Sequence, residues 1–300
     1  MAALVGDLDA TLQLLVELLG WAPWHVYEIQ PPRLQDRTYR GRPGTFSMLG
    51  AETHVGPIDF ALNQRLTGPS IYDEYLARRG FGLHHLACMP AAVSAEDDVD
   101  KRFVPDGAGV AMAGRIDEQV EFAYFDTEPE LGVSIETGSG HAISLPADRV
   151  IDSDRGVTRP TASLDEITVV VEDLDRAVSA YTRMLHWGPW TVHQRHDLLA
   201  DARLDGTPVL VTGRAARTTV GPVIFELAEP GHAPSLERDM LRAAGPGLHH
   251  ITCALPDLDR ARASDVLASH GLGVAMAARS GPSEIWYVDT VVRLKLAFVH

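Results

Sequence analysis

Two histidine pairs and a few carboxylates in apolar stretches are the residues of this 300-residue chain best suited to chemistry. A Gly-Leu-His-His sequence occurs twice and ends at His85 and at His250. Glu136 and Glu226 stand inside apolar, strand-like segments, where an unpaired carboxylate is costly. Imidazole and carboxylate together suit Zn, Mn, Co or Ni. The same carboxylates could instead be neutralised by an arginine, so a metal site and a salt bridge are the two interpretations.

Other chemistries find little support in the sequence. There is no Gly-rich phosphate loop, no Ser-His-Asp pattern and no thiol nucleophile pattern. Cys88 and Cys253 follow the two histidine pairs and lack a metal-type Cys-x-x-Cys partner, so we interpret both as free core thiols. A lone buried histidine is usually a hydrogen-bonded core residue. His84 and His249 fit that role, and His250 also fits it.

An internal repeat places these residues in equivalent positions of two halves. The matching segments are Trp-x-Pro-Trp (21–24 and 187–190), Val-Gly-Pro (55–57 and 220–222), Gly-Val-Ala-Met-Ala (109–113 and 273–277) and Tyr-x-Asp-Thr (124–127 and 287–290). A finer repeat of an Asp-Leu-Asp motif begins at residues 7, 173 and 257. Repeats of this kind indicate a fold built from copies of one unit. We infer four modules, two in each half.

The third module shows the order of elements most clearly. Residues 167–171 predict a strand, and Asp173 can cap a helix whose apolar residues follow at helical spacing. Strands are expected at 190–195, 209–211 and 223–228, with a turn at 205–206. Elsewhere, 70–79 and 235–244 predict short connecting helices, and 31–42 predicts a long loop that covers a site.

Composition limits the possible partners and location. The formal net charge of −15 argues against nucleic acid and anionic membrane as partners. The chain has no apolar run long enough to span a membrane and no basic region at its start typical of a signal peptide. We expect a cytoplasmic protein. The predicted organisation is a first half at 1–147, a linker at 148–163 and a second half at 164–300.

The four modules and these motifs resemble the vicinal oxygen chelate superfamily, which includes glyoxalase I, methylmalonyl-CoA epimerase, bleomycin-resistance proteins and extradiol dioxygenases. The resemblance covers nearly the whole chain, and the His-His-x-x-Cys element is most similar to the glyoxalase and epimerase branch. It implies an α+β fold in which four βαβββ modules form two cupped mixed β-sheets with flanking helices.

The resemblance also implies where metal ligands stand, with one in the first and one in the last strand of each module. The first module has no residue at its first position and Ala61 at its last. The other modules offer His85 with Glu136, Glu166 with Glu226, and His250 with Val299. If the second module pairs with the third, one complete set arises for a single divalent ion (Zn, Ni, Co or Mn): His85, Glu136, Glu166 and Glu226. We prefer this crossed pairing to pairing within each half.

The implied activity is that of a metal-dependent lyase, isomerase or epimerase. Proton transfer would occur next to a metal-bound carbonyl of a small-molecule substrate, with Glu136 and Glu226 as the catalytic carboxylates. A metal-free binding protein is the alternative, and an extradiol dioxygenase a more distant one, since the latter needs two histidines and a glutamate in the second half. A homodimer is possible. Aromatic residues could line a cleft (Trp24, Tyr39, Tyr124, Trp190 and Tyr287), and Arg40 and Arg42 could meet an anionic substrate.

Overall fold

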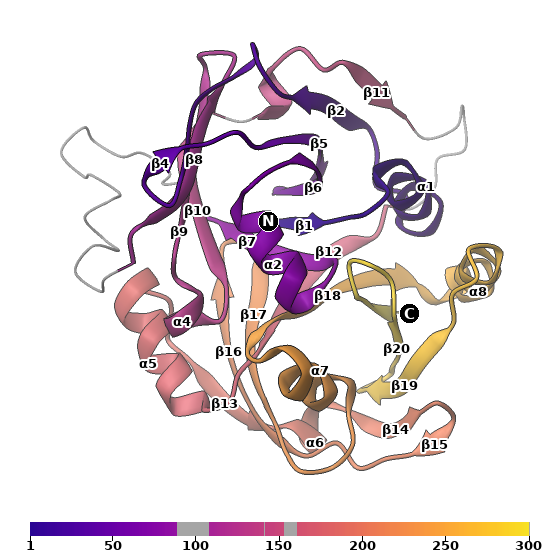
Figure 1. The fold of residues 1–300 in the computed structure, drawn as a ribbon. Helices are drawn as coiled ribbons and strands as arrows, with labels where there is room; N and C mark the ends of the chain where they lie inside the picture. The colour runs from indigo at the N-terminus through magenta and orange to yellow at the C-terminus, as the bar shows by residue number, and fades with distance from the viewer. Residues whose placement is uncertain (89–107, 141, 153–160, 300) are drawn as a thin grey trace. The chain divides into compact units, whose positions relative to one another are not determined.

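The computed structural model describes residues 1–88, 108–140, 142–152 and 161–299 (Figure 1). The expected linker therefore falls partly outside the described residues, at 153–160. The chain divides into two compact units. One contains Met1–Leu8, Pro23–Thr53 and Asp59–Asp152, and the other contains Asp9–Ala22, His54–Ile58 and Ser153–His300. No helix in the described ranges is long and apolar enough to cross a membrane.

The strands of the first half form one eleven-stranded sheet. The elements in chain order are β1 (Ala2–Leu4), α1 (Leu8–Leu19), β2 (Trp24–Ile29), β3 (Leu34–Tyr39), β4 (Arg42–Pro43), β5 (Ser47–Val55), β6 (Ile58–Thr67), α2 (Ile71–Arg79), β7 (Gly82–Ala87), β8 (Val110–Ile116), β9 (Val120–Phe125), α4 (Glu128–Leu131), β10 (Ser134–Ser139) and β11 (Arg149–Ile151). The sheet order is β11-β2-β5-β6-β1-β7-β10-β9-β8-β3-β4.

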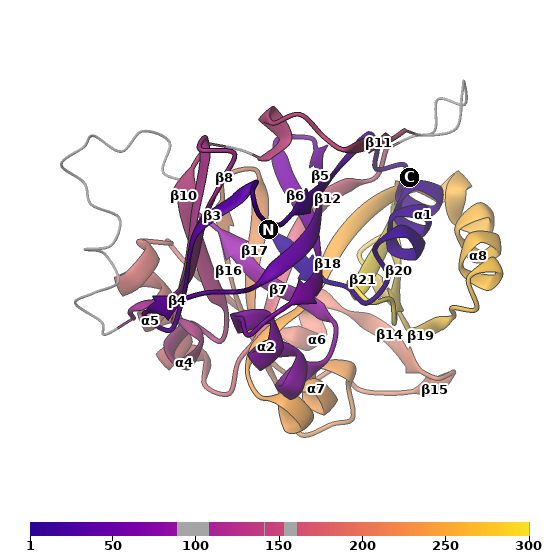
Figure 2. The same ribbon diagram turned by 45° about the horizontal axis from the view of Figure 1, so that its top comes forward.

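The second half repeats this arrangement in a ten-stranded sheet. Its elements are β12 (Ser163–Val170), α5 (Leu174–Leu185), β13 (Thr191–Gln194), α6 (Arg195–Leu198), β14 (Ala200–Leu204), β15 (Thr207–Pro208), β16 (Gly213–Val220), β17 (Val223–Pro230), α7 (Leu236–Ala244), β18 (Gly247–Pro256), α8 (Arg260–Ser269), β19 (Val274–Ser280), β20 (Ser283–Val288) and β21 (Leu294–Val299). The order β13-β16-β17-β12-β18-β21-β20-β19-β14-β15 mirrors that of the first sheet. The expectation of four modules in two curled mixed sheets is confirmed (Figure 2).

Successive modules pair with each other, so the crossed pairing that we preferred is wrong. Strand β1 lies between β6 and β7, parallel to the former and antiparallel to the latter. Strand β12 lies in the same way between β17 and β18. The connections through α2 and α7 are short, and sequential elements joined by short connections usually pack side by side. Each half therefore builds its own sheet.

The helix cap and the tight turn predicted in the third module are both confirmed. The Asp173 side chain accepts a hydrogen bond from the Arg176 backbone N–H at 3.0 Å and caps α5. Helix α5 packs against β16 and β17. The two residues of the turn after β14, Asp205 and Gly206, have positive φ angles of 46° and 76°, as a tight hairpin turn requires.

Two segments differ from expectation. Residues 31–42 are a hairpin arm rather than a loop, because β3 pairs with β4 and with β8 of the next module. The equivalent arm in the second half is β14–β15, which pairs with β19. Instead of the strand expected at 209–211, the structure has the short strand β15 at Thr207–Pro208, after which the Val209 N–H still donates to the Ala202 carbonyl at 2.9 Å. These arms extend each sheet across its two modules.

Candidate functional site

The two histidine pairs lie at β-bulges at the centre of each sheet. In the first half Ala2 pairs with His85 and Ala3 with Leu83, so His84 is the extra residue. Neighbouring residues of a regular strand point to opposite faces, whereas a bulge re-aims one of them. The Nδ1 atoms of His84 and His85 consequently lie 2.8 Å apart. The second half has the same bulge, with 2.7 Å between the Nδ1 atoms of its histidine pair.

His85 and Glu136 form the core of a candidate site in the first half. The Nε2 atom of His85 lies 2.9 Å from Oε2 of Glu136 on the neighbouring strand β10. Their side chains are 3% and 15% exposed, so the pair is mostly sheltered from water. Tyr124 stands opposite Glu136 on β9, and burial followed by the Glu136 charge raises the pKa of its phenol well above the ordinary value. The hydroxyls of Tyr124 and Tyr72 lie 3.0 Å apart.

Glu52 on β5 belongs to the same cluster. Burial, followed by repulsion from Glu136, raises the pKa of the Glu52 carboxyl from 4.5 to about 7, against one hydrogen bond from the Ile143 N–H that lowers it. A carboxyl with a pKa near 7 is suited to general acid–base work. Sequence reasoning did not find Glu52. The repeat shows only that Glu52 and Arg217 occupy equivalent positions, since both precede Val-Gly-Pro by the same spacing.

The raised pKa of Glu52 predicts a pH effect on stability. Above pH 4.5 the unfolded state loses the proton while the folded state keeps it up to pH about 7. Stability should therefore fall as pH rises through this window, by at most about 3 kcal/mol. Glu52→Gln should remove that dependence and be the more stable form at pH 8. Urea unfolding of both proteins at pH 5 and 8 measures this, and equal pH slopes would contradict it.

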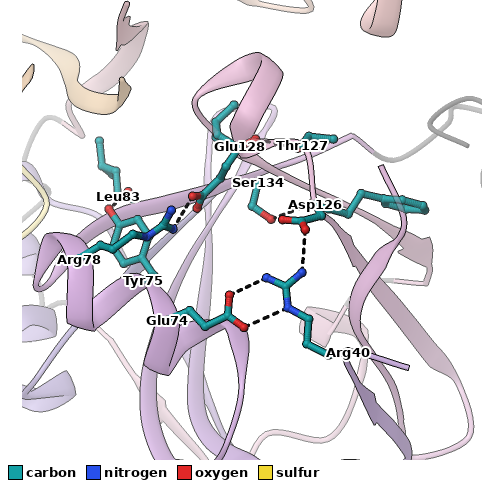
Figure 3. Close-up of polar contacts among 11 residues, drawn as sticks. Arg40, Glu74, Tyr75, Arg78, Leu83, Asp126, Thr127, Glu128 and Ser134 are labelled. Atoms are coloured by element: carbon teal, nitrogen blue, oxygen red, sulfur yellow. Dashed lines mark hydrogen bonds and ion pairs between the residues drawn. The ribbon is translucent and has the colours of Figure 1, made fainter. Parts of the chain in front are cut away.

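Side chains of helix α2 contact β7 and the segment after β9 (Figure 3). The Tyr75 hydroxyl donates a hydrogen bond of 2.5 Å to the Leu83 carbonyl on β7. From the β3–β4 arm, Arg40 reaches Glu74 at 2.5 Å and Asp126 at 2.7 Å. The arm, α2 and the end of β9 are thus tied together. Arg40 is committed to these ion pairs, so it is a structural residue and not the substrate contact considered above.

The second half places Glu166 and Glu226 in a network of ion pairs. The Nη2 atom of Arg217 lies 2.7 Å from Oε2 of Glu166 and 2.7 Å from Oε2 of Glu226. Lys295 contacts the other oxygen of Glu166 at 2.9 Å, and the Thr252 hydroxyl donates to it at 3.1 Å. Burial alone would raise the pKa of Glu166, but Lys295 and Arg217 lower it. This is the salt-bridge interpretation that the sequence left open.

Lys295, and not Val299, occupies the fourth ligand position of the second half. Glu136 pairs with Ala87, two residues after His85, and Lys295 pairs with Thr252, two residues after His250. We had set Val299 at this position because the Tyr-x-Asp-Thr segments were aligned without a gap. The β9–β10 connection contains the four-residue helix α4, which has no counterpart between β20 and β21.

The four residues predicted as one metal set are therefore divided. His85 and Glu136 contact each other in the first sheet, and Glu166 and Glu226 share Arg217 in the second. His250 is neutral, because burial lowers its pKa well below the ordinary value. Its Nε2 atom is buried and has no hydrogen-bond partner among the described residues.

A further group of potential ligands lies in the second half. Within the described residues, Glu237, His249 and His250 have ligand atoms within 4.8 Å of one another. Glu237 is already paired with the buried Arg195 at 2.5 Å, and the two rings are hydrogen-bonded to each other. An additional cation beside buried Arg195 would be repelled, so we assign this group to the core and not to a metal.

Comparison with known proteins agrees with this fold. No family model and no curated protein matches the chain by sequence. A mutant of 4-hydroxymandelate synthase from Streptomyces coelicolor matches with a TM-score of 0.59 and 16% identity over 99% of this chain and 91% of that one. A xylose isomerase-like TIM barrel/4-hydroxyphenylpyruvate dioxygenase fusion protein gives 0.50 and 13%, over 99% and 48%. The chain therefore has the vicinal oxygen chelate fold in its four-module, two-domain form. At these identities the likeness concerns the fold, and the chemistry depends on the site.

The two halves differ in how well they suit the metal that this fold implies. In the first half an imidazole nitrogen and a carboxylate oxygen face each other, which is a donor pair that fits a borderline divalent ion. The bulge adds support, because a metal-bound imidazole usually donates its other N–H to a fixed partner, here Nδ1 of His84. In the second half the carboxylates already bind the guanidinium and ammonium groups. The first half therefore offers one donor pair for a metal, whereas the carboxylates of the second half are already paired with cations.

Proposed function

We propose that the chain is a metal-dependent enzyme of the vicinal oxygen chelate type whose working site is in the first half. His85 and Glu136 would hold one divalent ion, which supplies polarisation of a substrate carbonyl when bound. The observation that carries the proposal is the sheltered contact of 2.9 Å between His85 and Glu136, with the Glu52 carboxyl of pKa about 7 in the same cluster. The reaction is proton transfer at the carbon next to that carbonyl, as in a lyase, isomerase or epimerase.

Different residues of the chain have different roles in the proposed reaction. Glu52 is half-buried and changes protonation near neutral pH, so it takes the proton from carbon and returns it. Tyr124 keeps its proton at neutral pH because its pKa is raised, and its hydroxyl can donate to a substrate oxygen. Glu226, which we had named as a second catalytic carboxylate, is held by Arg217 in the other sheet. We now assign the base to Glu52.

A dioxygenase is the second candidate, because the two structural neighbours described above carry the names of a hydroxymandelate synthase and a dioxygenase fusion. The extradiol branch requires two histidines and a glutamate in the second half. This chain has Glu166, His250 and Lys295 at those positions, and a protonated lysine cannot ligate a metal. We therefore favour proton transfer in the first half over oxygen chemistry in the second.

Isotope exchange tests this function. The protein is incubated in heavy water with a panel of hydroxy- and oxo-carbonyl compounds, and deuterium entering carbon is measured by NMR. Glu52→Gln and Glu136→Gln should each slow exchange by about 10²-fold or more. Glu226→Gln is the matched control and should keep most of the rate. Oxygen consumption without exchange would replace the proposal by the dioxygenase.

A further inference from the structure

The two sheets have four outer edges, and three of them carry features that discourage a further strand. The outermost strands are β11 and β4 in the first sheet and β13 and β15 in the second. Strands β4 and β15 have two residues each and end in Pro43 and Pro208, which have no N–H to donate. Strand β11 has three residues and begins with the exposed Arg149. Proline, charge and short length are means by which proteins protect a sheet edge.

Strand β13 has neither proline nor charge to protect it. Its sequence, Thr-Val-His-Gln at 191–194, contains no proline, lysine, arginine or carboxylate. Three of its four residues are exposed, and Val192 has an exposed fraction of 53%. One side of the strand pairs with β16, and no strand within the described ranges pairs with the other side. Strand β13 is therefore an unprotected edge with an exposed apolar side chain.

The first half shows how the equivalent edge accepts a strand. Val26 and Val192 each stand two residues after the tryptophan that ends a Trp-x-Pro-Trp segment, so β2 and β13 are equivalent. Strand β11 pairs antiparallel with β2 on the side away from β5, and Arg149 stands opposite Val26. Val26 is 3% exposed beside β11, whereas Val192 has no such neighbour. The module is thus compatible with an antiparallel strand on this edge.

The same comparison indicates which backbone groups of β13 point outward. In β2 the Val26 carbonyl accepts from the Asp148 N–H at 2.9 Å, and the Glu28 N–H donates to the Asp148 carboxylate at 2.7 Å. Alternate residues of a strand direct their backbone groups to the same side. By the spacing from Trp-x-Pro-Trp, the outward residues of β13 are Val192 and Gln194.

A second copy of the chain presents the same edge in a complementary form. Two antiparallel β13 strands related by a two-fold axis match their outward groups when Val192 of one copy stands opposite Val192 of the other. In this register the two residues exchange both backbone hydrogen bonds, and their exposed side chains meet as an apolar cross-strand pair. No lysine, arginine or carboxylate of β13 opposes this pairing.

We propose that β13 is a self-association surface through which two copies of the chain pair antiparallel and join their second sheets. A ladder of four residues covers far less than the about 1,200 Å² of a stable interface, so the dimer is weak and forms at high protein concentration. The net charge of −15 makes two copies repel each other, so salt should strengthen the association by screening this charge.

Sedimentation of the whole chain over a concentration series tests the proposal. At about 0.5 M NaCl, where the net charge is screened, the natural protein should pass from monomer to dimer between about 10 μM and 1 mM. Val192→Lys removes the apolar pair and sets two ammonium groups opposite each other, so it should weaken the dimer by about 10-fold or more. Lysine also makes the chain less negative, so general repulsion between copies cannot cause this loss.

Val150 on β11 provides a matched control. It is 55% exposed and lies on an edge strand that Arg149 protects, so Val150→Lys should dimerise like the natural protein. A natural chain that stays monomeric at about 1 mM would overturn the proposal, even if β13 then binds an extended segment of another protein. A Val192→Lys variant that dimerises as well as the control would also overturn it.

Disulfide linking tests the register directly. In a hydrogen-bonded antiparallel pair the Cα atoms are about 5.5 Å apart, which lies within the range for a disulfide. Val192→Cys should therefore form a linked dimer under mild oxidation. Val150→Cys contains the same natural cysteines, Cys88 and Cys253, and should form much less. Equal linking in the two variants would contradict pairing through β13.

Discussion

Replacing Arg195 by Met is expected to lower the free energy of unfolding by about 3–5 kcal/mol, because it leaves a buried charge without a partner. The Arg195 guanidinium at the start of α6 lies 2.5 Å from Glu237 on α7, and the two side chains are only 3% and 1% exposed. Burial would raise the pKa of Glu237, but Arg195 and then His249 lower it to about 2. Urea unfolding at pH 7 measures the loss.

The same pair provides its own controls. Arg195→Met combined with Glu237→Leu removes both charges and should recover most of the stability, since an apolar pair of similar volume often replaces a buried ion pair at little cost. The exposed Arg203→Met on β14 should change stability by less than about 0.5 kcal/mol. Because the pKa of Glu237 is depressed, the stability lost in Arg195→Met should become smaller as pH falls from 4.5 towards about 2. A single variant as stable as the natural protein would show that the pair is dispensable.

The four modules could be predicted from the sequence, but the way in which they pair could not. The cap at Asp173 and the turn at 205–206 depend on local chemistry, and both are found where they were predicted. The pairing of modules depends on which strand edges meet, and no motif records that. We inferred it from a count of ligand types, which favoured the second module with the third. That count was misleading because Arg217 forms ion pairs with Glu166 and Glu226, so these two carboxylates need no metal to balance their charge.

The candidate site was found in part for similar reasons. His85 and Glu136 are in contact, as a shared role for them requires. Glu52 was missed because the raised pKa of its carboxyl depends on burial and on repulsion from Glu136, which are properties of the folded state. Lys295 was missed because the insertion of α4 shifts the alignment of the last strands. The histidine pair itself was noticed, but only the bulge explains why two adjacent rings lie within hydrogen-bonding distance.

Loss of His85 should have the largest effect on metal binding. If the ion is held in the first half, His85→Ala removes a direct ligand and should weaken binding by at least about 10²-fold. His250→Ala should leave binding nearly intact, because the second half is neutralised by Arg217 and Lys295. The two histidines occupy equivalent strands and bulges, with exposures of 2% and 1%, so the stability costs of the two variants should be similar. Glu226→Gln should likewise keep the ion, whereas Glu136→Gln should lose it.

The most direct measurement is the metal content per chain of His85→Ala and His250→Ala, purified side by side and analysed by mass spectrometry after equilibration with Zn²⁺. We predict about one ion in the natural protein and in His250→Ala, and almost none in His85→Ala. An ion kept by His85→Ala and lost from His250→Ala would contradict a site in the first half and move the metal into the second.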